Sequence, residues 1–203
     1  KMLFPVLICA IIAGVLSTSV EDINDYVDIV LSELARQILK PYRPTDSFNK
    51  TVMGRPEIWA YFGDIAITGY EHLQRDDDCK FLEEPTVTRI VIHCNLTAKE
   101  LKVDISGSLK HSTYPPRGIR ASGLFPNSKI AMTIAAEPWK EINVTAKLKL
   151  SVPEINVVNL GEEAKYNSIR LGYRHEIINI MKNSQYDLAK ELKKAADTEV
   201  IPF

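Results

Sequence analysis

Residue types that carry out enzyme chemistry are present in this 203-residue sequence, but their spacing does not assemble a recognisable site. The four histidines are far apart along the chain, at His72, His93, His111 and His175. Catalytic and zinc-binding histidines are expected beside a second ligand or base at a defined spacing. The motifs H-E-x-x-H and G-x-S-x-G and a glycine-rich phosphate loop are missing. We therefore expect a protein that is not an enzyme, with no metal ion and no cofactor.

The acidic run Asp76-Asp77-Asp78 could suggest a calcium site. An EF-hand loop, however, takes its ligands from alternating positions, and three adjacent carboxylates cannot converge in that way. A solvated turn is the simpler interpretation. A hydrolase would need a serine with a base in reach, which isolated residues cannot establish.

The N-terminal residues predict secretion. An apolar run over residues 3–16, which includes Cys9, is followed by Ser17-Thr18-Ser19. Such a run is typical of a signal peptide and short for a transmembrane span, with a retained membrane anchor as the alternative. We expect a signal peptide over residues 1–19, a single domain over residues 20–203, an extracellular location, and no transmembrane segment after cleavage.

Removal of the signal peptide leaves Cys79 and Cys94. An even pair in a secreted chain predicts a disulfide bond, here closing a loop of about 15 residues. Three Asn-X-Thr sequons, at Asn49, Asn95 and Asn143, predict a glycoprotein. The formal charge of −1 argues against a nucleic-acid partner, which would call for a basic surface.

Two segments have helical periodicity. The longer spans residues 167–197, roughly 40 Å of helix at 1.5 Å per residue. Its apolar residues recur at steps of three and four, at Ile169, Tyr173, Ile177, Ile180, Met181, Leu188, Leu192 and Ala195. The shorter begins after the capping residue Ser19, ends at Lys40 before Pro41, and has an apolar stripe at Ile23, Tyr26, Val27, Val30, Leu31, Leu34 and Ile38.

Residues 41–56 are expected to form a loop, and most of the chain from residue 57 to residue 160 predicts antiparallel strands with one apolar and one polar face. In the first strand, Trp59, Tyr61, Ile65 and Ile67 are expected to share the apolar face, with a bulge at Gly63-Asp64.

Three turns or breaks are expected within the later strands. Residues 97–100 would turn a hairpin, and Pro115-Pro116 and Pro126-Asn127 would interrupt the chain. Further strands follow over residues 130–136, 142–150 and 154–160. Asn95 and Asn143 fall on the polar face, which agrees with glycosylation there.

Residues 63–79, with the sequence GDIAITGYEHLQRDDDC, followed by the strands Ile90-Val91-Ile92-His93-Cys94 and Leu101-Lys102-Val103-Asp104-Ile105, resemble the arthropod group 7 mite-allergen-like secreted proteins. The resemblance covers most of the mature chain. It implies the tubular lipid-binding fold of bactericidal/permeability-increasing, takeout and juvenile-hormone-binding proteins. This is an α+β fold in which a strongly curved antiparallel sheet wraps a long C-terminal helix, with a shorter N-terminal helix.

The function expected from this resemblance is a secreted, non-catalytic binding protein for a hydrophobic small molecule or lipid. The alternative is a secreted glycoprotein that binds a host or microbial protein or surface component and has no lipid cavity. The apolar residues expected to face inward are core candidates first and ligand contacts second. They are Trp59, Ile65, Ile67, Ile92, Val103, Ile105, Met132, Ile134, Val144, Leu148, Ile177, Ile180 and Met181.

Overall fold

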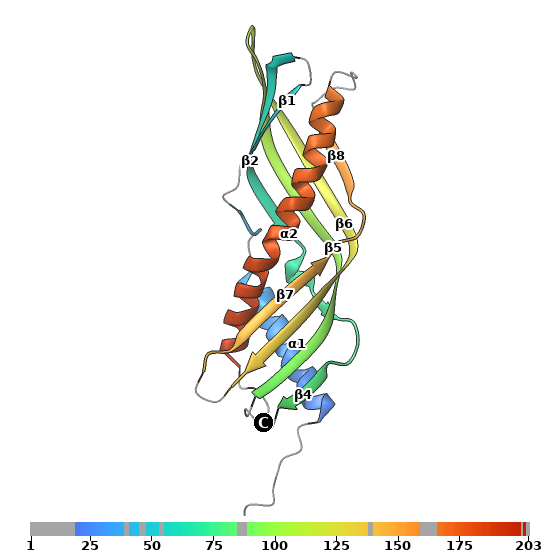
Figure 1. Ribbon diagram of the computed structural model, residues 1–203, viewed down its shortest axis with the longest axis vertical. Coiled ribbons are helices and arrows are strands. Elements are labelled where there is room, and N and C mark those ends of the chain that lie inside the picture. The colour runs from blue at the N-terminus through green and yellow to red at the C-terminus, as the bar shows by residue number, and fades with distance from the viewer. Residues whose placement is uncertain are drawn as a thin grey trace, which may run out of the picture.

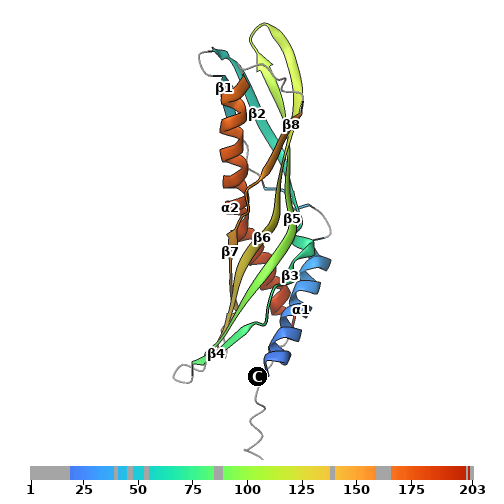
Figure 2. The same ribbon diagram turned by 90° about the vertical axis from the view of Figure 1, so that its right-hand side faces the viewer.

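The computed structural model describes residues 19–38, 41–44, 48–52, 55–84, 89–137, 140–158, 166–199 and 201. The expected signal peptide and Cys9 lie outside these residues, apart from Ser19. The molecule is elongated, and one long helix, α2 (Asn167–Asp197), runs along most of its length (Figure 1). A shorter helix, α1 (Val20–Gln37), lies at one end of the molecule, beside the C-terminal end of α2 (Figure 2).

Within the described residues the strands form one antiparallel sheet with the order β1-β2-β5-β6-β7, in which β3 and β4 pair with β5 and β8 pairs with β6. A 3-10 helix, η1 (Tyr70–His72), follows β2. The strands are β1 (Phe48–Val52), β2 (Arg55–Thr68), β3 (Gln74–Arg75), β4 (Lys80–Glu84), β5 (Arg89–His111), β6 (Tyr114–Ala136), β7 (Asn143–Lys149) and β8 (Glu154–Val158).

The sheet is a long, twisted band that α2 follows, and it is not strongly curled around the helix (Figures 1 and 2). The α+β class and the two helices agree with expectation, but the wrapped, strongly curved sheet does not. Five strands on the main path span only about 20 Å at 4.7–4.9 Å per strand, about twice the diameter of a helix. That width flanks a helix without enclosing it.

Helix α1 starts as the sequence predicts. The Ser19 side chain accepts a hydrogen bond from the Asp22 backbone N–H at 3.1 Å, and the Asp22 carboxylate accepts one from the Ser19 backbone N–H at 2.9 Å. This reciprocal pair is a capping box. The predicted stripe is buried from Ile23 to Leu34. The helix ends at Gln37, earlier than expected, because Ile38 leaves the helical region at φ −92° and ψ 49°.

Helix α2 has the bounds that the sequence predicts, and all eight residues of its expected stripe are buried. It contacts β1 and β7, the first and the last strand in the main strand order of the sheet. The Gln185 side-chain oxygen of α2 accepts a hydrogen bond from the Leu148 backbone N–H of β7 at 3.3 Å. Helix α2 therefore satisfies an edge amide that would otherwise be open to another strand.

The first half of β2 presents the opposite face from the one expected. Ile58, Ala60 and Phe62 are buried, whereas Trp59 is only half-buried and Tyr61 is 40% exposed. The predicted bulge is present: pairing with β5 shifts between Gly63 and Ile65, and Asp64 has φ 48°. One extra residue reverses the side-chain alternation, so the residues before the bulge cannot share the parity of Ile65.

Strands β5 and β6 are each continuous over 23 residues, so the turn expected at residues 97–100 and the two proline breaks are wrong. The hairpin turn lies at Ser112-Thr113. Pro115 and Pro116 precede the residues of β6 that pair with β8, and Pro126 lies between those that pair with β8 and those that pair with β7. Among the described residues, β6 pairs only with β5 at these positions, and proline is tolerated in a strand where one edge has no strand partner.

Residues 41–56 also contain structure that the sequence analysis missed. Strand β1 pairs with β2, and Tyr42 forms an isolated bridge with Ile67, with two backbone hydrogen bonds of 2.8 and 2.9 Å. The predicted disulfide is confirmed: Cys79 and Cys94 are bonded, which ties the start of β4 to β5.

Candidate functional site

The thirteen apolar residues expected to face inward do not all lie in the interior. Eleven of them are buried within one continuous hydrophobic core: Ile65, Ile67, Ile92, Val103, Ile105, Met132, Ile134, Val144, Ile177, Ile180 and Met181. Leu148 is half-buried against that core. Trp59 lies apart, on the other face of β2, with the Lys110 ammonium 4.7 Å from its ring centroid. Their role in binding a ligand stays a prediction, since burial alone describes a core.

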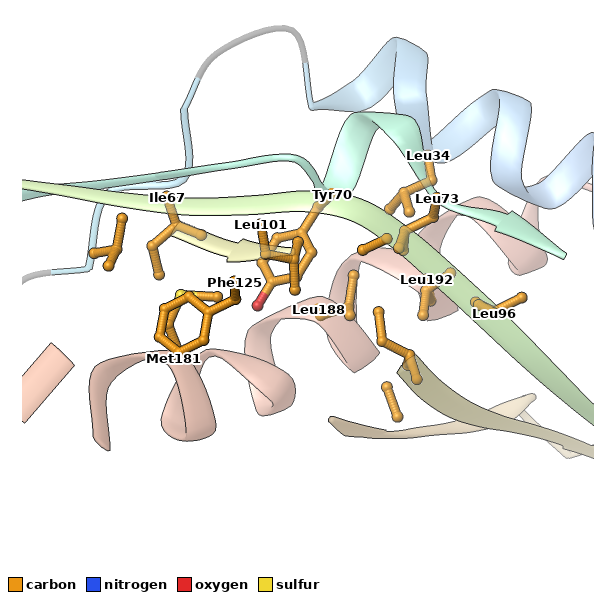
Figure 3. Close-up of a cluster of buried hydrophobic side chains, with 14 of the residues drawn as sticks. Leu34, Ile67, Tyr70, Leu73, Leu96, Leu101, Phe125, Met181, Leu188 and Leu192 are labelled. Carbon is orange, nitrogen blue, oxygen red and sulfur yellow. The ribbon is translucent and has the colours of Figure 1, made fainter. Parts of the chain in front are cut away.

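The middle of α2, where a ligand would be expected, packs directly on the sheet. A Cβ placed on Gly123 of β6 would lie 2.7 Å from Ile177 Cγ2. The rings of Phe62 and Tyr173 meet edge to face with centroids 4.5 Å apart. Figure 3 shows the neighbouring cluster, in which Phe125 and Met181 lie close together between the strands and α2. At these positions protein side chains fill the interior.

A polar pair interrupts this core, and the sequence analysis missed it. The Tyr70 hydroxyl of η1 and the Ser184 hydroxyl of α2 are 2.5 Å apart, and Ser184 donates to the Met181 carbonyl at 2.7 Å. Both side chains are buried. Burial, opposed by the Ser184 hydrogen bond and assisted by Asp187, raises the pKa of Tyr70 to about 12. The available cue was Ser184 itself, a polar residue three positions after Met181 in an otherwise apolar stripe.

The acidic residues 76–78 are exposed, and polar contacts hold two of them, Asp76 and Asp78, in place. Asp76 pairs with Lys129 and also accepts a hydrogen bond from Thr97 Oγ1 at 2.9 Å. Asp78 accepts one from the Asn24 side-chain amide of α1 at 2.8 Å. In the part of the chain that the structure describes, no group of three or more histidine, cysteine, aspartate or glutamate residues could hold a metal ion.

Open grooves lie on the polar side of the sheet. One, of about 750 Å³, is lined by Asp76, Asp77, Asn95, Asn127, Lys129, Ile130, Ala131, Lys147, Leu148, Lys149, Leu150 and Ser151. A smaller one of about 360 Å³ contains the Arg43–Asp64 ion pair and Arg120, over β2, β5, β6 and β8. Neither groove can be predicted from periodicity within a strand, because both grooves depend on the pairing between strands.

No described helix combines the length and the apolar character that crossing a membrane requires. No family model matches the chain, and no curated protein matches its sequence. A solved structure described as lipopolysaccharide binding protein is similar, with a TM-score of 0.56 and 9% identity, over 88% of this chain and 38% of that chain. An identity this low shows the fold alone. The chain therefore has the fold of one part of lipopolysaccharide binding protein and spans less than two fifths of that protein's length.

Proposed function

We propose that this protein is a secreted, non-catalytic binding protein for a hydrophobic small molecule or lipid. The observation that carries the proposal is the fold that the chain shares with a protein whose description names lipopolysaccharide, a lipid-bearing molecule, as what it binds. The sheet-and-helix interior, with its large apolar core, supports the same reading.

Two further features support an extracellular location. The Cys79–Cys94 disulfide is stable in oxidising compartments and rare in the cytosol. Of the three sequons, Asn95 and Asn143 have exposed side chains, as glycan acceptors require. The resemblance to arthropod group 7 mite-allergen-like proteins is a narrower proposal within this one, and it rests on the sequence.

The filled interior bears on how a ligand would be accommodated. Ile177 occupies the space over Gly123, and Met181 lies against Phe125 (Figure 3). A ligand between α2 and the sheet would have to displace these side chains. The displacement need not be large, since methionine is unbranched and adapts its shape to irregular apolar surfaces.

The same packing favours a second candidate function, a secreted glycoprotein that binds a host or microbial protein or surface component through its exposed face. Here α2 would serve as a structural support for the sheet. The grooves on the polar side, rather than the interior, would then contact the partner.

The two functions differ in whether an apolar molecule enters the protein. Native mass spectrometry and solvent extraction of protein from its own tissue should reveal a co-purifying apolar molecule, which the carrier proposal requires. Delipidated protein should also bind a fluorescent fatty-acid probe and release it to an unlabelled competitor, with urea-unfolded protein as the control. If nothing co-purifies and the probe binds folded and unfolded protein equally, the carrier proposal fails and the second function is favoured.

A further inference from the structure

The groove of about 750 Å³ on the polar face has an unusual arrangement of charge. We call it the Lys147–Lys149 groove, after two of its lining residues. Lys149 of β7 is the direct cross-strand partner of Lys129 of β6, and Lys147, two residues earlier on the same face, is opposite Ala131. Residues directly opposite in an antiparallel pair have Cβ atoms about 5 Å apart, and like charges in such pairs are destabilising.

Within the part of the chain that the structure describes, only one of these three lysines has an ion-pair partner. Lys129 pairs with Asp76, and this hydrogen bond is the main reason that the pKa of Asp76 is lowered. Among the described residues, the ammonium groups of Lys147 and Lys149 have no ion-pair or hydrogen-bond partner, and both side chains are exposed. Lysines two residues apart on a strand are about 7 Å apart along it, so one multi-oxygen anion can lie between their ammonium groups.

The shape of the groove also suits a ligand. Its volume lies in the range of small-molecule sites, about 300–1,000 Å³. Ala131, opposite Lys147, leaves the floor low between the strands. Half-buried Leu148 and Leu150 and the lysine methylene stems add apolar surface beside the charges. Asp77 also lines the groove, and its negative charge opposes an anion. The sequon residue Asn95 lines it as well, so the binding test uses protein without a glycan at Asn95.

We propose that the Lys147–Lys149 groove binds an anionic group, a phosphate or a carboxylate, held between the Lys147 and Lys149 ammonium groups. Resting on the proposed function, this group is the acidic head of the amphiphile that the protein carries. A free phosphate has the same chemistry, and experiment distinguishes the two sources. Lysine suits such a ligand as a flexible point charge with three donors.

The test is titration calorimetry with decyl phosphate below its critical micelle concentration, with decyltrimethylammonium and inorganic phosphate as separate titrants. Lys147→Gln/Lys149→Gln should weaken decyl phosphate binding about tenfold or more, the loss expected from one or two charge-assisted hydrogen bonds. Lys182→Gln/Lys190→Gln, on exposed positions of α2, makes the same change in net charge outside the groove and should leave the affinity unchanged.

A second variant works in the opposite direction. Asp77→Asn removes the opposing charge and should strengthen decyl phosphate binding several-fold, an effect that 0.5 M NaCl reduces. Competition by inorganic phosphate at millimolar concentration would assign the site to free phosphate, and binding of decyl phosphate alone would assign it to a lipid head. Equal affinity of the wild type and Lys147→Gln/Lys149→Gln, or equal binding of the cationic amphiphile, would overturn the proposal.

The outcome is separable from that of the proposed function. If the groove variant binds decyl phosphate normally while delipidated wild type still takes up the fatty-acid probe, the groove proposal fails and the carrier function stands. If the wild type takes up no apolar probe but binds phosphate, and the groove variant does not bind phosphate, the carrier function fails and the anion site stands.

Discussion

Gly123 shows how one residue sets the distance between the sheet and its helix. Any Cβ at this position would lie 2.7 Å from Ile177 Cγ2 and 3.3 Å from Val103 Cγ1, both on buried side chains with little room to move. Gly118, on the same strand, has nothing within 4 Å of its Cβ position. The two glycines therefore form a matched pair, one required for packing and one not.

We expect Gly123→Ala to lower the free energy of unfolding by about 1–3 kcal/mol, the usual cost of an extra methyl group in a filled core. Gly118→Ala should change it by less than about 0.5 kcal/mol. Urea unfolding followed by circular dichroism measures both. Combined with Ile177→Ala, which removes the clashing methyl group, the Gly123→Ala cost should shrink. A full Gly123→Ala cost in that background would mean that Ile177 is not the cause.

The Tyr70–Ser184 pair predicts a pH dependence. The folded pKa of Tyr70 is about 12, against 10.0 in the unfolded chain, chiefly because of burial. Stabilisation from the neutral tyrosine is complete below pH 10 and is lost as the pH rises from 10 to about 12. Tyr70→Phe cannot ionise. Between pH 8 and pH 11.5 the free energy of unfolding should therefore fall in both proteins. The fall should be about 2 kcal/mol larger in the wild type than in Tyr70→Phe. Parallel declines would contradict this.

At the scale of elements, the sequence predicted those whose periodicity is long and uninterrupted. Helix α2 has the expected bounds, and β7 and β8 lie where their alternation placed them. The turn predictions were wrong where the local residue composition and the pairing between strands favour different structures. The polar residues 97–100 and the prolines of β6 suggested turns, but long-range pairing between β5 and β6 outweighs those local preferences. Local sequence does not reveal which strand edges have partners, and that decides whether a proline is tolerated.

The reversal of β2 has a more specific lesson. The sequence predicts a bulge at Gly63-Asp64, and the observed register shift between Gly63 and Ile65 reverses the parity of Trp59 and Tyr61, which the alternation alone does not indicate. The Lys147–Lys149 groove could not be predicted from the sequence for a related reason. Lys129 and Lys149 become neighbours only through the register of β6 with β7, and that register depends on contacts between residues distant in sequence.

The disulfide is the element-scale link that can be removed most cleanly. It joins residues 15 apart and ties the short strand β4 to β5. In the chain-entropy model, a loop of this length contributes about 3 kcal/mol. Cys79→Ala/Cys94→Ala should therefore lower the free energy of unfolding by about that amount. Removal of the disulfide should also accelerate amide exchange more in β4 than in β7, a strand that the bond does not join. Uniform acceleration in both strands would instead indicate global destabilisation.

For the whole molecule, the central question is whether the interior opens. Helix α2 is held along its length by the rings of Phe62 and Tyr173, by Ile177 over Gly123, and by the Gln185 hydrogen bond to β7. A carrier in which the ligand lies between α2 and the sheet must break some of these contacts on loading. A protein that binds its partner through the polar face need not break any of them.

Hydrogen exchange measured by mass spectrometry separates these two mechanisms. On addition of a fatty acid to delipidated protein, the carrier mechanism predicts altered amide protection in the middle turns of α2, near Ile177 and Met181, and in the part of β6 around Gly123. Helix α1 lies at one end of the molecule (Figure 2) and serves as an internal control that should change little. Decyl phosphate, whose head group is proposed to lie in the Lys147–Lys149 groove, should in addition protect β7 amides. Since local opening reports on contacts that must be broken, unchanged α2 protection at saturating fatty acid would exclude loading between α2 and the sheet and leave the polar face as the binding surface.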